Sequence, residues 1–433
     1  MIYRTVILLY SALVRAIQAL SGAAGLFNSK FARRASARRR IRARWITGAG
    51  SFSPGSRKIW FHVASVGEFL QAKPVISLLT ENDSTEIEIA LTFSSPSGME
   101  NYRKFLADSE SDMIKFVDYL PMDTPANARF CLDTLEPDLI VYVKYDLWPN
   151  LILAASGRGI RQILIAAGLS ESSGRYSRAG SWFYGPLYSA LELISASTDE
   201  EAERFRKCSP GASIITGGDT KFDQVYRRIT EGGSALPVPA LPSGSEYIIA
   251  GSTWPGDESL LLNGYSVLKK RFSNLSLIIA PHEPTPERVA EVIDRGRARS
   301  LSPAALSNLD EGMNPPVIIA DGIGYLAELY RAGIIAYVGG AFSAGVHNVL
   351  EPAVLGLPVL FGPGIDNSHE AKELAALGAG SVVESPERLV EEVSAMLSDR
   401  DLIVRRGRTG RDYIESNLGA SIKYRDLIFD FME

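Results

Sequence analysis

The sequence GGAFSAGVHNVLEPAVLGLPVLFGP (residues 339–363) decides the fold, because a strand end, a glycine-rich loop, a helix start and a second strand follow one another in it. Asn348 is placed to cap the helix, and Gly356 ends it as the C′ residue before a buried strand over 357–361. This order forms a βαβ unit whose loop and helix start are suited to an anion. The alternative is an ordinary structural turn.

The same alternation of short apolar runs and longer amphipathic stretches continues through most of the chain. The short apolar runs, which are the predicted strands, are IWFHV, IEIALTF, DLIVYVKY, QILIA, ELISAS and ASIITGG in the first half of the chain. In the second half they are EYIIAGS, NLSLIIAP, PVIIADG, IIAYVGG and LPVLFGP. Strands that alternate with helices form parallel sheets covered on both faces. The pattern predicts an α/β fold with two Rossmann-like parallel-sheet domains that face each other across a cleft.

A chain of 433 residues exceeds what one hydrophobic core usually supports, which agrees with two domains. A segment rich in Gly, Pro and Ser interrupts the pattern and is the predicted linker. The expected divisions are a membrane-associating helix and basic segment (1–44), a first Rossmann-like domain (45–228), the linker (229–245), a second Rossmann-like domain (246–400) and C-terminal helices that pack back on the first domain (401–433).

The two cysteines, Cys131 and Cys208, do not form a CxxC pattern. This spacing argues against a disulfide framework and against a cysteine-based zinc site. The four histidines are scattered and give no HExxH or similar spacing. The residues therefore predict no metal site.

The net charge of −5 hides a strong asymmetry, because the first acidic residue of the chain is Glu68. Twelve Lys and Arg precede it, so residues 1–67 carry about +12 and the remainder about −17. Such a segment attracts either nucleic acid or an anionic membrane surface. The basic run over 30–44 directly follows an apolar stretch over 1–27, which favours the membrane.

The apolar stretch is interrupted by Arg4, Ser11, Arg15 and Gln18, which fall on one side of a helix. It is too broken to span a membrane, which takes about 20 apolar residues, and it lacks the clean core of a signal peptide. The pattern predicts an amphipathic helix that lies in the membrane interface, with the basic run on the cytoplasmic side. The alternative is a helix that packs on its own domain or on a partner.

Glu68 follows the predicted strand 59–63, at a strand end where open α/β sheets bind ligands. A carboxylate there is a candidate catalytic base. Ser65 and Glu68 also form the S-x-x-E pattern of a capping box, which is a purely structural alternative. A helix N-terminus favours the charged carboxylate and so limits its basicity.

Two further strand ends carry polar groups that could face an anionic acceptor. TFSSPSG (92–98) offers hydroxyl and N–H groups, and KYDLWPN (144–150) adds the positive charge of Lys144. Within the second segment, Trp148 is predicted to pack and Asn150 to cap a helix.

In the second half of the chain, four strand-end loops carry small or polar residues suited to a phosphate or a nucleotide. They contain Gly251, Ser252 and Thr253; Pro281 and His282; Ile323, Gly324 and Tyr325; and Asn348, Val349, Leu350 and Glu351. A lone histidine is usually packed or solvated, so His282 is a candidate only because it shares this rim with the other loops.

HVASVGE, TFSSPSG, DLWPN, GST, the AP-H loop, the DG-GYL loop and GG-F-GVHNVLEPAVLGLPVLFGP together resemble the Kdo (3-deoxy-D-manno-octulosonic acid) transferases of lipopolysaccharide synthesis. The resemblance covers nearly the whole chain in order and spacing. It implies a GT-B fold whose first domain binds the acceptor and whose second binds the nucleotide sugar. It also implies an inverting, metal-independent transfer of Kdo from CMP-Kdo to a lipid A precursor (lipid IVA). We expect no cofactor, no nucleic-acid partner, and a monotopic or single N-terminal anchor at the cytoplasmic face of the inner membrane.

By position, Glu68 matches the proton acceptor of that family. The nucleotide-binding positions match as well: Pro281 and His282 occupy the family's Pro-Arg position, Ile323 to Tyr325 its Met-Gly-Glu-like loop, and Asn348 to Glu351 its Asn-x-x-Glu segment. The resemblance implies that the Glu of this segment accepts hydrogen bonds from the ribose.

The chain departs from the family pattern at four positions. Many members have Arg where His282 stands and an acidic residue where Lys144 stands, and polar residues are usual in place of Trp254 and Tyr325. Two other functions therefore stay open. One is a GT-B sugar-nucleotide epimerase, which acts on a soluble substrate, and the other is a non-catalytic, membrane-anchored lipid-binding protein.

Overall fold

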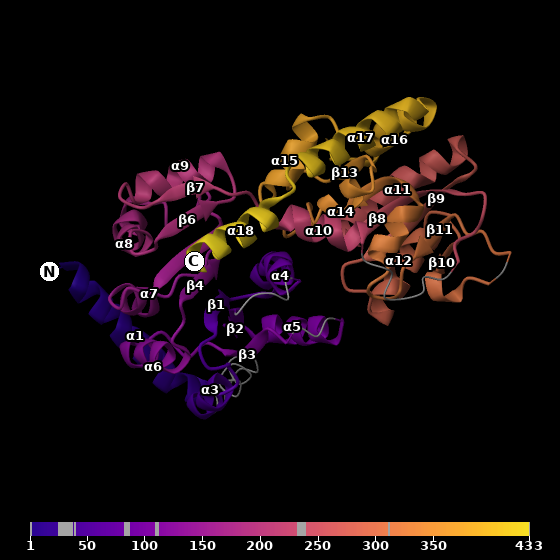
Figure 1. The fold of residues 1–433 in the computed structure, drawn as a ribbon. Coiled ribbons are helices and arrows are strands. Elements are labelled where there is room, and N and C mark those ends of the chain that lie inside the picture. Colours follow the sequence, from indigo (N-terminus) through magenta and orange to yellow (C-terminus); the bar gives the residue numbers. More distant parts are fainter. Residues whose placement is uncertain are drawn as a thin grey trace. The chain divides into compact units, whose positions relative to one another are not determined.

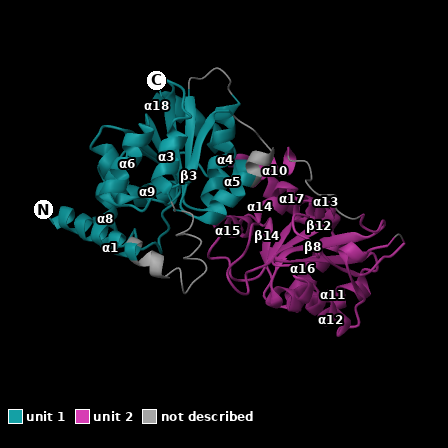
Figure 2. Ribbon diagram, turned by 90° about the horizontal axis from the view of Figure 1, so that it is seen from below, with its two compact units in different colours: residues 1–224, 418–433 teal, residues 225–417 magenta. Residues whose placement is uncertain are grey.

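The computed structural model describes residues 2–24, 38, 40–81, 87–108, 112–231, 240–310 and 312–432. The chain divides into two compact units, residues 1–224 with 418–433 (unit 1) and residues 225–417 (unit 2), coloured separately in Figure 2. Each unit holds one seven-stranded sheet, and every strand pairing in the described residues is parallel. The predicted α/β class with two Rossmann-like sheets is confirmed.

The sheet of unit 1 has the strand order β3-β2-β1-β4-β5-β6-β7 (Figure 1). Its strands are β1 (Arg57–Val63), β2 (Ile87–Phe93), β3 (Ile114–Tyr119), β4 (Leu139–Val143), β5 (Arg161–Ala167), β6 (Leu193–Ala196) and β7 (Ile214–Thr216). The helices of this unit are α1 (Ile2–Ala24), α3 (Ile41–Ala49), α4 (Val66–Thr80), α5 (Pro96–Asp108), α6 (Pro125–Leu135), α7 (Pro149–Ser156), α8 (Arg178–Tyr188), α9 (Asp199–Cys208) and α18 (Ala420–Met432).

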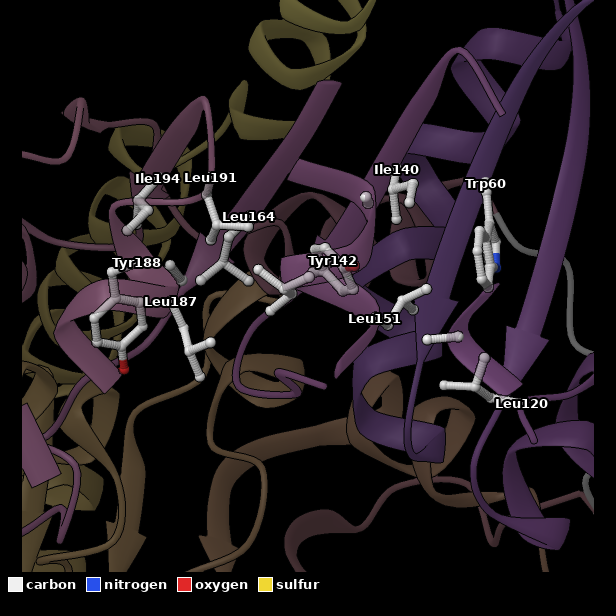
Figure 3. Close-up of a cluster of buried hydrophobic side chains, with 14 of the residues drawn as sticks. Trp60, Leu120, Ile140, Tyr142, Leu151, Leu164, Leu187, Tyr188, Leu191 and Ile194 are labelled. Carbon is white, nitrogen blue, oxygen red and sulfur yellow. The ribbon is translucent and has the colours of Figure 1, made fainter. Parts of the chain in front are cut away.

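Both faces of this sheet are buried, because successive residues of a strand point to opposite sides. One face carries Ile59 and Phe61 of β1 and packs against apolar side chains of α4 and α18. The other face carries the cluster of Figure 3, which spreads from Trp60 past Tyr142 to Tyr188. Burial on two sides explains why these strands read as uninterrupted apolar runs.

The sheet of unit 2 has the strand order β10-β11-β9-β8-β12-β13-β14. Its strands are β8 (Glu246–Thr253), β9 (Leu275–Pro281), β10 (Pro303–Ala305), β11 (Val317–Ile319), β12 (Gly333–Val338), β13 (Val359–Phe361) and β14 (Gly380–Val382). The helices are α10 (Lys221–Thr230, which begins in unit 1), α11 (Pro255–Arg271), α12 (Pro286–Arg297), the 3₁₀ turn η1 (Leu306–Asn308), α13 (Leu326–Ala332), α14 (Leu350–Val354), α15 (His369–Ala376), α16 (Pro386–Ser398) and α17 (Arg400–Ser416).

The order of the strands reverses between β1 and β4 in unit 1 and between β8 and β12 in unit 2. Doubly wound sheets bind ligands beyond the carboxyl ends of their strands at such a reversal point. The segments that follow these four strands are therefore the first places to look for a site.

The division between the units lies between Gln224 and Val225, within α10, rather than in the predicted linker 229–245. Residues 232–239 of that linker lie outside the described part of the chain. The predicted C-terminal segment 401–433 is divided as well, because α17 belongs to unit 2 and α18 to unit 1.

Helix α18 completes the core of unit 1. The hydroxyl of Tyr424 donates to the Gly218 carbonyl at 2.7 Å and accepts from the Ala166 N–H at 3.1 Å. Its ring belongs to the same apolar cluster as Phe61 of β1. The last thirteen helical residues therefore contribute to the fold of the first domain.

Helix α1 packs on its own unit through one side. The Tyr3 hydroxyl donates to the Phe183 carbonyl of α8 at 3.2 Å, and the Ser11 hydroxyl donates to Asn150 Oδ1 of α7 at 2.9 Å. Ser11 is 3% exposed, so it does not lie on a solvated polar face as predicted. Arg4 and Arg15 are exposed. The hydrogen bond to Asn150 explains why the hydroxyl of Ser11 can be buried.

The opposite side of α1 presents an apolar row to solvent. Its exposed members are Ile2, Leu8, Leu9, Leu13 and Ile17. None of the described helices is long and apolar enough to cross a membrane. Of the predicted basic run 30–44, residues 30–37 and 39 lie outside the described residues, as does the end of the apolar stretch at 25–27.

Candidate active site

Glu68 lies at the reversal point of the sheet in unit 1. β1 ends at Val63, and α4 begins three residues later, which places Glu68 in the first turn of that helix. The Ser65 hydroxyl accepts from the Glu68 N–H at 3.3 Å, and the Glu68 carboxylate accepts from the Ala64 N–H. The predicted capping pattern is therefore present, and Ser65 is the N-cap.

The capping role does not make Glu68 an ordinary solvated carboxylate, because its residue surface is only 6% exposed. Burial, followed by the negative charge of Asp146, raises the pKa of Glu68 to about 7. The N–H groups of Ala64 and Ser65 and the ammonium of Lys144 oppose this shift. The expected limit on basicity from the helix N-terminus is thus outweighed by burial and a like charge.

Asp146 follows β4, the strand on the other side of the reversal point. Its Oδ2 accepts from Nε2 of His62 at 3.1 Å and from the indole N–H of Trp148 at 2.7 Å. Burial opposes ionisation of Asp146, but these two hydrogen bonds hold its pKa below the usual value. The residue that raises the pKa of Glu68 is therefore kept charged by its own donors.

His62 is fully buried at the end of β1, and its two ring nitrogens have defined partners. A carboxylate only accepts, so the Nε2 that faces Asp146 carries a proton. Nδ1 lies 2.8 Å from the Thr92 hydroxyl, which also accepts the indole N–H of Trp60 at 2.8 Å. The chain of hydrogen bonds holds His62 and Asp146 in place beside Glu68.

The sequence placed Thr92 and Asp146 in two segments that could face an acceptor, but it gave neither residue a role of its own and did not select His62. A signal was present, since Asp146 lies in the DLWPN motif directly after a strand and His62 interrupts an apolar strand. Trp148 packs against His62, with ring centroids 5.6 Å apart, as predicted for a packing residue, and it is also a donor to Asp146.

Asn150 does not cap a helix, which corrects the prediction. Trp148 is the N-cap of α7, and Asn150 lies inside the helix, where its amide donates to the Asp123 carbonyl at 2.7 Å. The carboxylate of Asp123 accepts the N–H groups of Asn150 and Leu151 at 2.9 and 3.1 Å. A residue distant in sequence therefore satisfies this helix N-terminus.

The other two polar features of this rim are partly engaged in local structure. In the TFSSPSG segment, the Ser95 hydroxyl accepts from the Gly98 N–H at 3.2 Å, and Ser94 Oγ lies 3.4 Å from His62 Nε2. Lys144 has a left-handed backbone, with φ of 65°, and its ammonium lies 5.3 Å from the centre of the Tyr145 ring. Lys144 remains a positive charge close enough to Glu68 to affect its pKa.

In unit 2, the loop after β8 and the loop after β12 meet at the reversal point. Gly251 pairs with Val338, and the Gly339 N–H donates to the Gly251 carbonyl at 2.9 Å. A Cβ on Gly339 would lie 2.5 Å from the Ser252 carbonyl oxygen, so only glycine allows this approach. Ser252 has a left-handed backbone, with φ of 54°.

Asp257 ties these two loops together. The fully buried carboxylate accepts the Trp254 N–H and the Gly340 N–H, both at 2.9 Å, and the Tyr337 hydroxyl at 2.8 Å. Three donors from three segments thus share one carboxylate. Both predicted phosphate loops are fixed relative to each other.

Pro281 and His282 join the same rim. Pro281 is the last residue of β9 and is paired with Thr253, and the His282 N–H donates to the Thr253 carbonyl at 3.0 Å. The Thr253 hydroxyl donates to the buried carboxylate of Glu258 at 3.2 Å, which also pairs with Arg288. The structure therefore brings 251–253 and 281–282 together, as expected for two loops of one site.

The loop with Ile323, Gly324 and Tyr325 follows β11 and leads into α13. Ile323 is 80% exposed, and Gly324 has a φ of 96° that favours glycine. Tyr325 is the N-cap residue of α13, and α13 contributes Leu326 and Tyr330, which would meet a Cβ placed on Gly251. This loop reaches the same rim through the start of α13.

The Asn348 to Glu351 segment forms a tight helix start. Asn348 Oδ1 accepts from the Leu350 N–H at 3.1 Å, although the assigned N-cap of α14 is Val349. Glu351 Oε1 accepts from the Asn348 amide at 2.9 Å and pairs with Arg228. Gly356 follows the helix with a φ of 73°, which confirms it as the C′ residue. A ribose bound to Glu351 would have to share or replace its present partners.

Among the described residues, no group of three or more His, Cys, Asp and Glu side chains could hold a metal ion. His282 and His347 lie side by side, but their rings are stacked rather than converging on one point. Unit 1 thus presents the buried carboxylate of Glu68 beside the half-buried one of Asp146, and unit 2 presents a set of glycine-rich loops.

Known proteins similar to this chain are 3-deoxy-D-manno-octulosonic acid transferases. A family profile described as 3-Deoxy-D-manno-octulosonic-acid transferase (kdotransferase) matches residues 33–224. The transferase of Aquifex aeolicus (strain VF5) is 30% identical over 342 residues, 78% of this chain and 86% of the relative. That of Haemophilus influenzae is 28% identical over 413 residues, 92% of each chain. A probable mitochondrial transferase of Arabidopsis thaliana is 30% identical over 379 residues, 84% of this chain and 82% of the relative.

Solved structures with a similar fold include sugar-nucleotide enzymes. UDP-GlcNAc 2-epimerase from Neisseria meningitidis bound to UDP-GlcNAc has a TM-score of 0.60 at 17% identity and covers 87% of this chain and 99% of its own. MurG of Acinetobacter baumannii has a TM-score of 0.51 at 14% identity and covers 86% and 99%. At these identities the likeness concerns the fold alone, and it agrees with the predicted GT-B class.

Proposed function

Because the chain belongs to the 3-deoxy-D-manno-octulosonic acid (Kdo) transferase family, we propose that it transfers Kdo from CMP-Kdo to a sugar hydroxyl of a lipid A precursor, lipid IVA. The family supports a glycosyltransferase of lipopolysaccharide biosynthesis. The observation that carries the finer proposal is Glu68, a buried carboxylate with a pKa of about 7 at the reversal point of the first sheet.

In the proposed step, Glu68 takes the proton of the acceptor hydroxyl as that oxygen attacks the anomeric carbon of Kdo. The new bond joins the acceptor oxygen to this carbon, and the bond from the carbon to the CMP phosphate oxygen breaks on the opposite face. The electron pair leaves with CMP. A base with a pKa near 7 is ionised in part at neutral pH and still holds a proton strongly once it has taken one.

The loops of unit 2 are the proposed CMP site, with contacts from Gly251 to Thr253, Pro281 and His282, Ile323 to Tyr325, and Asn348 to Glu351. Their support is the meeting of the loops after β8, β9 and β12 at one rim, where the N–H groups of Gly340 and His282 hold the loops together. A rim that is held in place before the reaction can stabilise charge that develops on the departing phosphate.

We test this function by incubating the purified protein with CMP-Kdo and tetraacyl lipid A precursor, and measuring CMP release and acceptor mass. The native protein is expected to turn over, and the mass steps count the sugars added. Glu68→Gln should lose roughly 10²- to 10⁴-fold in kcat, the range for a lost general base. The matched control is Glu136→Gln, an exposed glutamate of the same unit, which should keep native activity.

Other outcomes decide between the functions that the sequence left open. Turnover that persists in a folded Glu68→Gln variant would leave Glu68 with a capping role alone. Epimerisation of a UDP-sugar without CMP release would favour the epimerase, and binding of lipid without any turnover the anchored lipid-binding protein. Unchanged activity in EDTA is expected, because the resemblance implies a metal-independent reaction.

The exposed apolar row of α1 supports attachment to the membrane in which the acceptor's acyl chains lie. Deletion of residues 1–44 should release the protein from membranes while activity on a detergent-dispersed acceptor remains. A sharper variant is Leu9→Gln with Leu13→Gln, which keeps the Ser11 contact to α7. Binding to anionic vesicles should fall at least about tenfold, since full burial of one leucine is worth roughly 1.5–3 kcal/mol. Unchanged vesicle binding by both variants would contradict this attachment.

A further inference from the structure

Three aromatic rings in the proposed CMP site of unit 2 form one contact group. The indole N–H of Trp254 donates to Nε2 of His347 at 3.0 Å. The ring of His282 stacks on both of them, with centroids 5.2 Å from Trp254 and 4.5 Å from His347 and planes inclined by 22° and 14°. The rings come from the segments that follow β8, β9 and β12, beside the reversal point of the sheet.

The hydrogen bond from Trp254 determines the protonation state of His347. An indole nitrogen only donates, so Nε2 of His347 must offer a lone pair and the imidazole is neutral, with its proton on Nδ1. Burial, followed by repulsion from His282, lowers the pKa of His347, while the charge of Asp257 opposes that shift. Protonation of His347 at Nε2 would break the hydrogen bond from Trp254, because the indole N–H would then face a second N–H group.

The loop after β12 is built closely around His347. The His347 N–H donates to the Gly339 carbonyl at 3.0 Å, and a Cβ on Gly340 would lie 2.7 Å from Cδ2 of the His347 ring. Gly340 has a φ of 100°, and its N–H is bound by Asp257, which also binds the backbone N–H of Trp254. Trp254 and His347 are therefore held in one arrangement from both sides.

His282 lies on this pair and is exposed to solvent. Its backbone N–H is used by the Thr253 carbonyl, and the described part of the chain shows no hydrogen bond to either ring nitrogen. The charged or titratable groups that act on the stack are Asp257 from α11 and His347 from the loop after β12, and the next residue in the chain, Glu283, is exposed. Of the two stacked imidazoles, only His282 can take up a proton without breaking a hydrogen bond.

We propose that Trp254 and His347 are positioning residues that form a fixed aromatic platform, and that His282 on this platform is the titrating cation of the nucleotide-phosphate site. Binding of the anionic nucleotide is then coupled to proton uptake, because the phosphate favours the charged imidazole. The stacked indole also favours the cation over the neutral ring. This inference rests on the proposed function, since it assumes that a nucleotide phosphate reaches this rim.

The first test measures CMP binding by calorimetry from pH 6 to 8.5, in buffers with different ionisation enthalpies. The native protein should take up about half a proton at most, and its Kd should rise about tenfold as the pH increases. His282→Arg carries a permanent charge, so any pH dependence of its Kd comes from the titration of CMP itself. Once this contribution is subtracted, the Kd of His282→Arg should not change with pH. Equal pH dependence in the native protein and in His282→Arg would overturn the proposal.

The second test separates positioning from general stability. Trp254→Phe keeps an aromatic ring but removes the N–H donor, so His347 loses its fixed neutral state. We expect a three- to tenfold weaker Kd at pH 6 and a changed proton uptake, with less than a twofold effect in the His282→Arg background. His347→Asn ends the same hydrogen bond from the other side and should behave alike. Equal losses in both backgrounds would mean a structural role only and would overturn the proposal.

Failure of this inference can be told apart from failure of the proposed function. If the protein binds UDP rather than CMP, with proton uptake that His282→Arg abolishes, the Kdo transfer is wrong and the role of His282 stands. If CMP binds and Kdo is transferred without net proton uptake, the transferase stands and the role of His282 is refuted. If neither nucleotide binds, both are refuted.

Discussion

The reversal points of the two sheets differ in how they treat a buried carboxylate. In unit 1, Glu68 lies near the second carboxylate of Asp146, and its pKa rises to about 7. In unit 2, Asp257 is fully buried but enclosed by three donors, and the adjacent Glu258 is paired with Arg288. The donors bound to Asp146 stabilise its charge, whereas the N–H groups of Ala64 and Ser65 do not outweigh burial and the like charge at Glu68.

This difference shows two uses of the same topological position. A carboxylate with few donors and a like charge nearby holds a proton near neutral pH, which suits proton transfer. A carboxylate surrounded by backbone N–H groups instead fixes the loops that donate to it, which suits binding of a ligand by those loops. Under the proposed function, this difference agrees with chemistry in unit 1 and preorganised binding in unit 2.

The most disruptive change is expected in unit 2. Asp257→Ala would leave the Trp254 N–H, the Gly340 N–H and the Tyr337 hydroxyl buried without an acceptor, at a cost of about 3 kcal/mol in stability. At roughly 2–4 °C per kcal/mol for a domain of this size, the Tm of unit 2 should fall by roughly 6–12 °C. Differential scanning calorimetry checks this, with Asp257→Asn, which keeps one acceptor oxygen, losing less. An unchanged Tm in Asp257→Ala would mean that Asp257 does not fix the loops of unit 2, and the contrast with Glu68 of unit 1 would be lost.

The next change should stabilise unit 1. The pKa of Glu68 is raised from 4.5 to about 7 in the folded state, so folded protein holds this proton more tightly than unfolded protein does. Stability therefore falls as the pH rises from about 4.5 to about 7 and stays lower above that range. Glu68→Gln keeps an acceptor for the Ala64 N–H and has no charge to bury. It should gain about 3 kcal/mol over the native protein at pH 8 and almost nothing at pH 4.

The matched control for that experiment is Glu136→Gln, whose side chain is 77% exposed. It should show no stabilisation that grows with pH. A Glu68→Gln variant that is less stable than the native protein at pH 8 would mean that the capping hydrogen bond outweighs the cost of burying the charge.

The elements that the sequence did not predict are all strands at the edges of the sheets. β3, β10 and β14 each lie at an edge. β3 alternates between buried and half-buried residues, and β10 and β14 have three residues each. The interior strands are buried on both sides and read as apolar runs, whereas an edge strand has neighbours on one side only and needs no such run.

The site was predicted unevenly for a similar physical reason. Glu68 and each loop of unit 2 come directly after a predicted strand. Their place at the end of that strand could therefore be inferred from the neighbouring sequence alone. The pairing of His62 with Asp146 joins residues that lie 84 positions apart, and it depends on β1 and β4 being neighbours. The same holds for Ser11 and Asn150, where a tertiary contact buried a hydroxyl that the helical pattern placed on a polar face.

The smallest expected effect tests the link between the two carboxylates of unit 1. Asp146→Asn removes a negative charge beside Glu68 and keeps one oxygen that can accept from His62 or Trp148. The pKa of Glu68 should fall, and because the ionised base is the active form, the pH at which kcat/KM is half-maximal should move down by about one unit. The control is Asp133→Asn, which removes an exposed carboxylate of α6 and should leave the profile in place. If the pH of half-maximal kcat/KM stays near 7 in Asp146→Asn, burial alone raises the pKa of Glu68. The carboxylates at the two reversal points would then differ only in the hydrogen-bond donors around them, and the charge of Asp146 would have no part in the difference.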